Sequence, residues 1–336
     1  MFTYGELSKL RAIGLISGGL GMDILSQFTI LFIFLFVLAR SSQFVVESAV
    51  KLARFFKIGE ATIGFILIST STSLPELSVS LISSSANESA LAVGTAIGSN
   101  ITDLCVVLGI AAFISTIYVR SKELLSITRI LLVTSIIVIV LMITTKLDRL
   151  DGLILLALFA FYIYTLLKEK VTLGERGDVS RKEALRAFLF FAVGIAGVII
   201  SSGFVVDSAI KISDALNLAR SFIGATILAV GTSLPELAVG TTAVSSRHSS
   251  LALGDAIGSC MVNLTLVLGV AALINPPNIN MSMFDVLAGF LLITNMVFWY
   301  ILQTKKKLNR EYGAVMLLIY AIFLSVLFWA QGTLRV

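Results

Sequence analysis

The chain has 336 residues, of which 57% are hydrophobic and 13% are charged, and its mean hydropathy is +1.00. Soluble domains carry about 25% charged residues, so this composition excludes a soluble globular protein and indicates a polytopic membrane protein. The single His and the two Cys residues lack any metal-type spacing, and Cys105 and Cys260 are expected to be packing residues within apolar segments.

Ten apolar segments are long enough to cross a bilayer, which takes about 20 helical residues each. In chain order they cover 28–53, 61–85, 90–116, 124–145, 150–167, 187–215, 222–246, 250–274, 283–302 and 312–331. The expected fold is an all-α polytopic membrane protein with five helices on either side of a polar linker at 168–186. Residues 1–27 do not resemble a cleaved signal peptide, and we predict that they form an N-terminal segment at the membrane interface.

The basic residues orient these segments. The loops that would share a side with the linker 168–186 carry fifteen Lys and Arg, whereas the opposite side carries six. Because basic residues are concentrated in cytoplasmic loops, we predict a cytoplasmic linker and two outer termini in a cell-membrane protein. The net charge of +5 is thereby explained by topology, so we expect no nucleic-acid partner.

The chain contains an internal repeat. Residues 41–114 align without gaps with 201–274 at an offset of 160, and about 33 of the 74 pairs are identical. We therefore predict two five-helix repeats at 28–167 and 187–331. Because five is odd, the second repeat must enter the membrane in the opposite sense, which is the inverted arrangement of many secondary transporters with broken helices at the midplane.

The sequence TSLPEL occurs twice in apolar surroundings, at 72–77 and 232–237. A charged residue at bilayer depth costs roughly 2.5–3.5 kcal/mol on insertion scales. A proline in mid-span breaks the helix and frees a carbonyl one turn earlier, near Ser71 and Gly231. The repeated motif therefore predicts two half-sites for a cation, with Glu76 and Glu236 beside freed carbonyls.

The following segment of each repeat carries a polar stripe with a spacing of four residues, so its members share one helix face. The stripes are Thr95, Ser99 and Asp103 in one half, and Asp255, Ser259 and Asn263 in the other. Unpaired carboxylates inside a membrane indicate an ion pathway, and carboxylate, hydroxyl and amide oxygens suit Na⁺ or Ca²⁺. Asp255 lies two turns, about 12 Å, from Asn263, so we expect it at an entrance or outside the central ligands.

The chain has two TSLPE motifs, and each is followed by Gly-Ser and then by Asp or Asn. This pattern resembles the alpha repeats of the sodium/calcium exchanger family, which belongs to the cation/calcium exchanger superfamily. The resemblance is to the prokaryotic members of the family. It covers almost all of residues 28–331. The resemblance implies ten helices in two inverted halves, exchange of Ca²⁺ for Na⁺ by alternating access, and sliding of helices 28–53 and 187–215 past the remaining core. The ligands that it implies are Glu76, Asp103, Glu236 and Asn263 at the centre, with hydroxyls from Thr72, Ser73, Ser99, Thr232, Ser233 and Ser259.

The chain departs from the family pattern at three places. Prokaryotic members tend to have Asn in the first repeat and Asp in the second, whereas this chain has Asp103 first and Asn263 second. Thr95 and Asp255 stand where the family often has Asn, and the first motif begins Ser-Thr rather than Gly-Thr. These departures leave the stoichiometry and ion preference open.

Several alternatives remain at this stage. A proton-coupled exchanger on the same fold would carry a Glu near the positions of Ser99 and Ser259, and a potassium-dependent exchanger would have Asp at both Asp103 and Asn263. An intramembrane protease would need a Lys or His base beside a nucleophilic Ser, and none lies near the motif serines. A channel would be recognised by single-channel currents. We therefore expect a transporter of Na⁺ and Ca²⁺ in the lipid bilayer, not an enzyme, without a cofactor or an obligatory protein partner.

Overall fold

The computed structural model describes residues 24–55, 69–70, 72–119, 122–143, 147–168, 180–245, 249–277 and 281–333, and nearly all of them are helical. The α-helices are α2 (Ile24–Phe55), α4 (Leu74–Ser85), α5 (Ser89–Thr102), α6 (Leu108–Ile114), α7 (Lys122–Met142), α8 (Arg149–Lys168), α9 (Arg181–Leu216), α10 (Arg220–Ile223), α11 (Ala229–Thr232), α12 (Leu234–Ser245), α13 (Ser249–Val262), α14 (Leu268–Ile274), α15 (Met281–Lys305) and α16 (Arg310–Thr333). Three π-helical turns interrupt them: η1 (Asp103–Val107), η2 (Gly224–Leu228) and η3 (Asn263–Val267).

Seven of the described helices are long and apolar enough to cross a membrane. The count becomes eight when the bent pair Arg220–Thr232 and Leu234–Ser245 is taken as one span. This confirms an all-α polytopic membrane protein. The total of ten stays a prediction, because the segment predicted at 61–85 is described only in part, and residues 1–23 of the N-terminal segment lie outside the described residues.

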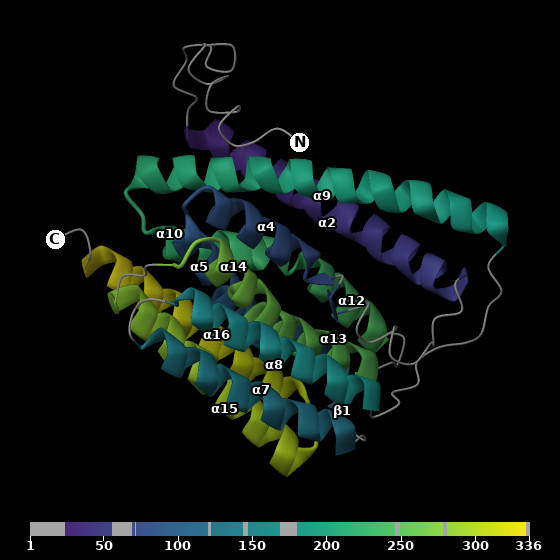
Figure 1. The fold of residues 1–336 in the computed structure, drawn as a ribbon. Helices are drawn as coiled ribbons and strands as arrows, with labels where there is room; N and C mark the ends of the chain where they lie inside the picture. Colours follow the sequence, from purple (N-terminus) through teal and green to yellow (C-terminus); the bar gives the residue numbers. More distant parts are fainter. Residues whose placement is uncertain are drawn as a thin grey trace, which may run out of the picture.

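Helices α2 and α9 lie side by side along one face of the bundle (Figure 1). Two aromatic pairs show that these helices run antiparallel. Phe34 stacks on Phe204 with ring centroids 4.1 Å apart. Phe44, ten residues later in α2, stacks on Phe190, which lies earlier in α9, at 6.3 Å. Helix α9 begins at Arg181, within the predicted linker, because Ser180 and Glu183 form a reciprocal capping box there.

Glycines in equivalent positions of the two halves make reciprocal contacts. Gly109 of α6 packs against Gly313 of α16, and a Cβ at Gly313 would lie 2.8 Å from the Gly109 carbonyl oxygen. Gly269 of α14 packs in the same way against Gly152 of α8, where the corresponding distance from a Cβ at Gly152 is 2.9 Å. Gly109 and Gly269 are separated by the repeat offset of 160. The same contact is thus made twice, with the roles of the two halves exchanged. Such paired contacts are typical of two units related by a two-fold axis.

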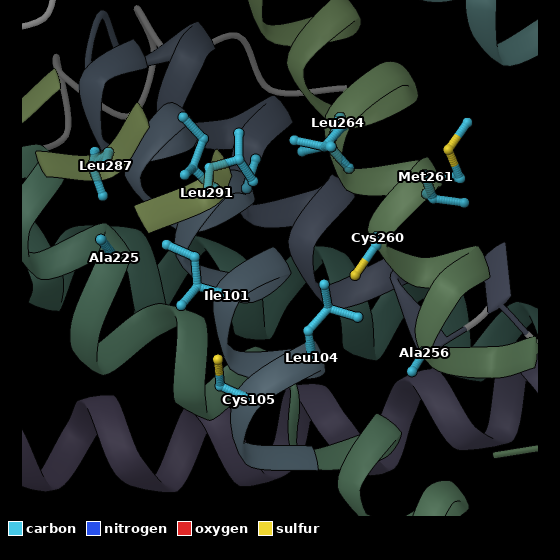
Figure 2. Packing of buried hydrophobic residues seen from close by; sticks show 14 of the residues in the cluster. Ile101, Leu104, Cys105, Ala225, Ala256, Cys260, Met261, Leu264, Leu287 and Leu291 are labelled. Carbon is cyan, nitrogen blue, oxygen red and sulfur yellow. The ribbon is translucent and has the colours of Figure 1, made fainter. Parts of the chain in front are cut away.

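The centre of this relation lies between α5 and α13. The Asn100 side chain donates to the carbonyl of Cys260 at 3.2 Å, and the Cys260 thiol lies 3.7 Å from the carbonyl of Asn100. These two residues are equivalent in the repeat, so the pseudo-two-fold axis passes close to them. Figure 2 shows Leu104 and Cys105 from the first half in the same buried cluster as Cys260 and Leu264 from the second.

Both cysteines are free and fully buried, as expected of packing residues. A short antiparallel strand pair, β1 (Ile117–Tyr118) with β2 (Lys307–Leu308), joins the chain after α6 to the chain before α16. The sequence patterns did not predict these strands, which are two residues long.

Candidate cation site

The two TSLPEL motifs interrupt their helices at the point where α4 and α12 begin. Pro75 and Pro235 lie in the first turn of these helices, where the missing backbone donor leaves no intrahelical bond unmade. In the second half, the helix bends by 41° at this break. Glu76 and Glu236 follow directly in the same first turn, where the dipole of each helix favours an anion. The local sequence thus places one carboxylate at the start of each broken helix.

On the partner helices, Asp103 and Asn263 each begin a π-helical turn, η1 and η3. A π turn accommodates an extra residue, disturbs the regular hydrogen-bond ladder, and occurs often at functional sites. The sequence spacing placed these residues on the polar helix face but did not predict the wider turn. Both residues are fully buried.

Hydroxyl groups join the two halves reciprocally. The Thr72 and Ser259 hydroxyl oxygens are 3.1 Å apart, and the equivalent pair, Thr232 and Ser99, is 3.3 Å apart. The Ser259 hydroxyl also donates to the Ser69 carbonyl at 3.5 Å, and that of Ser99 donates to the carbonyl of Ala229 at 3.4 Å. Each broken helix is therefore held against the polar stripe of the other half.

The predicted freed carbonyls were near Ser71 and Gly231. Ser71 lies outside the described residues. The carbonyls that meet the hydroxyls are those of Ser69 and Ala229, two residues earlier in each motif.

The same motifs and stripes carry a group of buried polar side chains whose side-chain nitrogen and oxygen atoms have no hydrogen-bond partner in the structure. They are Ser73, Glu76, Asp103, Ser233, Glu236 and Asn263. All six are among the predicted ligands, and the other four predicted ligands form the two hydroxyl pairs. Buried polar groups are almost always paired, and a bound cation would supply the missing partner for the oxygens of this group.

The carboxylates of this group also interact with one another. Ser99 and Thr232 lie beside the Glu76 carboxylate, near enough to interact electrostatically but outside hydrogen-bond geometry. Glu236 experiences the charges of both Glu76 and Asp103. Because like charges repel in a medium of low dielectric, this arrangement favours occupation by cations.

The acidic side chains do not form a metal site without other ligands. Within the described ranges, no three His, Cys, Asp or Glu side chains are grouped closely enough to hold a metal ion. A cation held here would therefore need hydroxyl, amide or backbone carbonyl oxygens to complete its ligand set. Such hard oxygen ligands suit alkali and alkaline-earth cations.

For Asp255 the sequence left two places open, an entrance or a position outside the central ligands, and the structure disagrees with the first. This residue is only 2% exposed, so it does not line an entrance, and its Oδ1 accepts a hydrogen bond from the Thr72 hydroxyl at 3.1 Å. The contact agrees with the other expected place, outside the central ligands, but the spacing along one helix could not show which side chain of the neighbouring broken helix Asp255 would contact. At the equivalent position, the Thr95 hydroxyl donates to the Leu91 carbonyl of its own helix at 2.9 Å.

A further polar contact was missed. The Asn295 side chain on α15 donates to the Asn100 side chain at 3.1 Å, which links α15 to the pseudo-two-fold axis. A lone Asn in an apolar segment was the available signal for it.

Comparison with known proteins identifies the family. The family model described as sodium/calcium exchanger protein matches residues 26–168 and 186–329. The inner membrane protein YrbG of Escherichia coli is 29% identical over 317 residues, which cover 91% of this chain and 98% of that protein. The sodium/calcium exchanger MaX1 of Methanosarcina acetivorans is 26% identical over 347 residues, with 90% and 99% covered.

Solved structures agree with this result. The sodium-calcium exchanger NCX_Mj soaked with 10 mM Na⁺ and zero Ca²⁺ matches with a TM-score of 0.66 and 28% identity, covering 90% of this chain and 99% of that one. The same exchanger soaked with zero Na⁺ and Ca²⁺ matches with a TM-score of 0.62. The broken helices and polar stripes described above fall within the matched residues, and the chain belongs to the sodium/calcium exchanger protein family.

Proposed function

We propose that this membrane protein is a secondary active antiporter that exchanges Ca²⁺ for Na⁺ across the cell membrane by alternating access. The observation that carries the proposal is the group of buried carboxylates without hydrogen-bond partners, in motifs and stripes that two equivalent hydroxyl pairs hold together across the halves. Membership of the exchanger family and the likeness to NCX_Mj support the same function.

The proposed architecture has ten membrane-spanning helices in two inverted five-helix repeats, 28–167 and 187–331. The antiparallel packing of the equivalent helices α2 and α9 supports the inversion. The linker 168–186 is cytoplasmic, both termini are outside, and residues 1–27 lie at the interface in this proposal, which rests on the distribution of basic residues.

The proposed central ligands are Glu76, Asp103, Glu236 and Asn263. Three carboxylates carry three negative charges, so one Ca²⁺ leaves a charge of −1 and three Na⁺ leave zero. Ca²⁺ and Na⁺ therefore compete for the same oxygens, and an antiporter requires such competition between its two substrates. An exchange of three Na⁺ for one Ca²⁺ moves one net charge, worth about 2.3 kcal/mol per 100 mV of membrane potential.

Helices α2 and α9 are the proposed moving elements. They pack on each other through stacked phenylalanines along one face of the bundle, and the ligand-bearing helices lie in the rest of it (Figure 1). Sliding of this pair relative to the rest would open the site to one side at a time.

Flux in liposomes tests the function. Purified protein should take up ⁴⁵Ca²⁺ when Na⁺ is inside the vesicles, and Glu76→Gln or Glu236→Gln should abolish this uptake because each removes a buried charge from the site. Glu311→Gln, which changes an exposed glutamate at the start of α16, is the matched control and should transport normally. Full uptake by the Glu76 and Glu236 variants would refute the site assignment.

Transport measurements also distinguish the alternative function, a proton-coupled cation exchanger. The mutual interaction of Glu236 with the other acids is the observation that favours it, because closely spaced carboxylates can take up protons. Replacing Na⁺ by choline and imposing a pH gradient separates the two functions. Uptake driven by the pH gradient alone would identify H⁺ as the coupling ion.

A further inference from the structure

Arg40 is a charged residue within an apolar membrane span. The span Ile24–Val45 of α2 includes it, and its side chain is exposed on the surface of the bundle. The residue at the equivalent position of the repeat is Ile200 of α9, which is 59% exposed, as expected of a helix face that lies against lipid. A charge on such a face needs a partner, because hydrocarbon does not solvate it.

The contacts of Arg40 leave most of its guanidinium available. Its Nη1 donates to Gln43 Oε1 at 2.7 Å, and its Cζ lies 5.9 Å from the centre of the Phe44 ring. A guanidinium has five N–H donors, and none of the ion pairs among the described residues includes Arg40. Because Gln43 and Phe44 follow Arg40, the guanidinium is directed towards the end of the span at Val45, five residues or about 7.5 Å along the axis. A long cationic side chain reaches the membrane interface in this way.

Further basic residues lie at the same end of the α2–α9 pair. Since Phe44 stacks on Phe190 and the helices are antiparallel, the residues after Phe44 and those before Phe190 extend towards the same side, which is the side of the linker (Figure 1). Lys51 lies about 10.5 Å beyond Phe44, on the helix face of Arg40. The exposed basic residues at this end of the described helices are Arg40, Lys51, Arg181, Lys182 and Arg186.

The charge of this end is positive even when its acidic residues are included. The exposed acidic side chains are those of Glu47 and Glu183, so five positive charges meet two negative ones and leave a net charge of +3. The Glu183 carboxylate also accepts hydrogen bonds from the backbone and hydroxyl of Ser180, in the cap of its own helix. The complementary ligand is therefore an anion at the membrane interface.

We infer that these five basic residues, the linker-side basic surface, bind the phosphate headgroup of an anionic phospholipid. Arginine and phosphate form paired, charge-assisted hydrogen bonds, and basic residues beside a membrane span attract anionic lipids. The choline group of a zwitterionic lipid would meet the same positive charges, so the surface favours a headgroup with a net negative charge. The bound lipid anchors one end of α2, which is a moving helix in the proposed function.

Thermal stability in detergent tests the binding. The purified full chain receives short-chain phosphatidylglycerol, short-chain phosphatidylcholine or inorganic phosphate. A ligand that binds the folded state raises the melting temperature, so phosphatidylglycerol should raise it more than either of the other two. Arg40→Gln should lose at least half of this rise, and its melting transition without lipid shows that the variant is folded.

Lys211→Gln is the matched control, because it removes the same charge from an exposed position near the opposite end of α9, where Lys211 pairs with Asp207 at 2.7 Å. This variant should keep the full rise. An undiminished rise in Arg40→Gln overturns the inference. An equal rise with phosphatidylcholine overturns the preference for an anionic lipid, and an equal rise with inorganic phosphate shows that the ligand is not a lipid. The measurement uses no ion gradient, so these results are independent of the ⁴⁵Ca²⁺ uptake that tests the proposed function.

Discussion

Asp103 and Asn263 occupy equivalent positions at the start of π-helical turns, yet only one carries a charge. Both side chains are buried without hydrogen-bond partners, so the backbone presents them in similar surroundings. In the proposed site the third central carboxylate, that of Asp103, therefore lies in the first half. Its total charge depends on the pair and not on which of the two residues is acidic.

This equivalence predicts the effect of a charge-conserving exchange. Asp103→Asn should weaken the apparent affinity for Ca²⁺ by at least about tenfold, which corresponds to about 1.4 kcal/mol for a lost charged ligand. The double variant Asp103→Asn with Asn263→Asp restores the charge and should recover most of the loss. The measurement is the Ca²⁺ concentration for half-maximal ⁴⁵Ca²⁺ uptake. A double variant as weak as Asp103→Asn would show that the position of the charge, and not its number, controls binding.

At the scale of elements, α5 packs directly against the backbone of η2 in the other half. A Cβ at Gly98 would lie 2.5 Å from the Ala225 Cα and 2.8 Å from the Ala225 carbonyl oxygen. In membranes, small residues allow helices to approach in this way and to gain van der Waals contact. This close contact positions Ser99, the residue after Gly98, against the broken helix of the other half.

Alanine substitutions at two glycines should therefore have opposite effects. Gly98→Ala should lower the melting temperature of the purified protein, because overpacking against a backbone costs about 1–3 kcal/mol. Gly289→Ala on α15 has no atom within 4 Å of the added Cβ, and it should keep or raise the melting temperature because Ala is the better helix former. Equal melting temperatures for the two variants would contradict the close contact.

The sequence predicted more of the fold than of the contacts within the candidate site. The apolar membrane-spanning helices followed from hydropathy, because a bilayer demands long apolar segments, and the repeat followed from the 160-residue offset. The π turns at Asp103 and Asn263 did not, since a periodicity of four residues does not distinguish an α turn from a π turn. The contact of Asp255 with Thr72 depends on helix packing across the repeat, which spacing along one helix does not contain.

At the scale of the whole molecule, Arg220 ties α9 to the rest of the bundle. Its guanidinium pairs with Glu88 in the loop before α5 and with Asp214 near the end of α9, each at 2.9 Å. It also donates to the Ile210 carbonyl of α9 at 3.1 Å. Arg220 and Glu88 are only partly exposed, at 20% and 26%, so salt screens their pair less than a surface pair, whereas Asp214 is 67% exposed.

A double-mutant cycle with Arg220→Gln and Glu88→Gln measures this tie. Because the two residues contact each other, their effects on the free energy of unfolding should be non-additive by about 0.5–3 kcal/mol. The exposed pair Asp207 and Lys211 serves as the reference and should give a coupling of about 0.2–0.5 kcal/mol. Additive effects of Arg220→Gln and Glu88→Gln would rule out the tie.

Calcium should stabilise the whole molecule through the site. A ligand at 100 times its dissociation constant adds about 2.7 kcal/mol to the stability of the folded state. The melting temperature of the protein in detergent should therefore rise with Ca²⁺ and fall when a chelator removes it. The Glu76→Gln and Glu236→Gln double variant should show no shift, and a shift of normal size in that variant would place Ca²⁺ at another site.

The burial of Cys105 and Cys260 has a practical consequence. Thiol reagents reach neither residue in the folded protein, so the natural chain already serves as an unreactive background for site-directed labelling. A single cysteine introduced on the outer surface of α2 or α9 would carry a fluorophore or spin label alone. Motion of these helices during a transport cycle could then be followed by spectroscopy without removing any native residue from the centre of the fold.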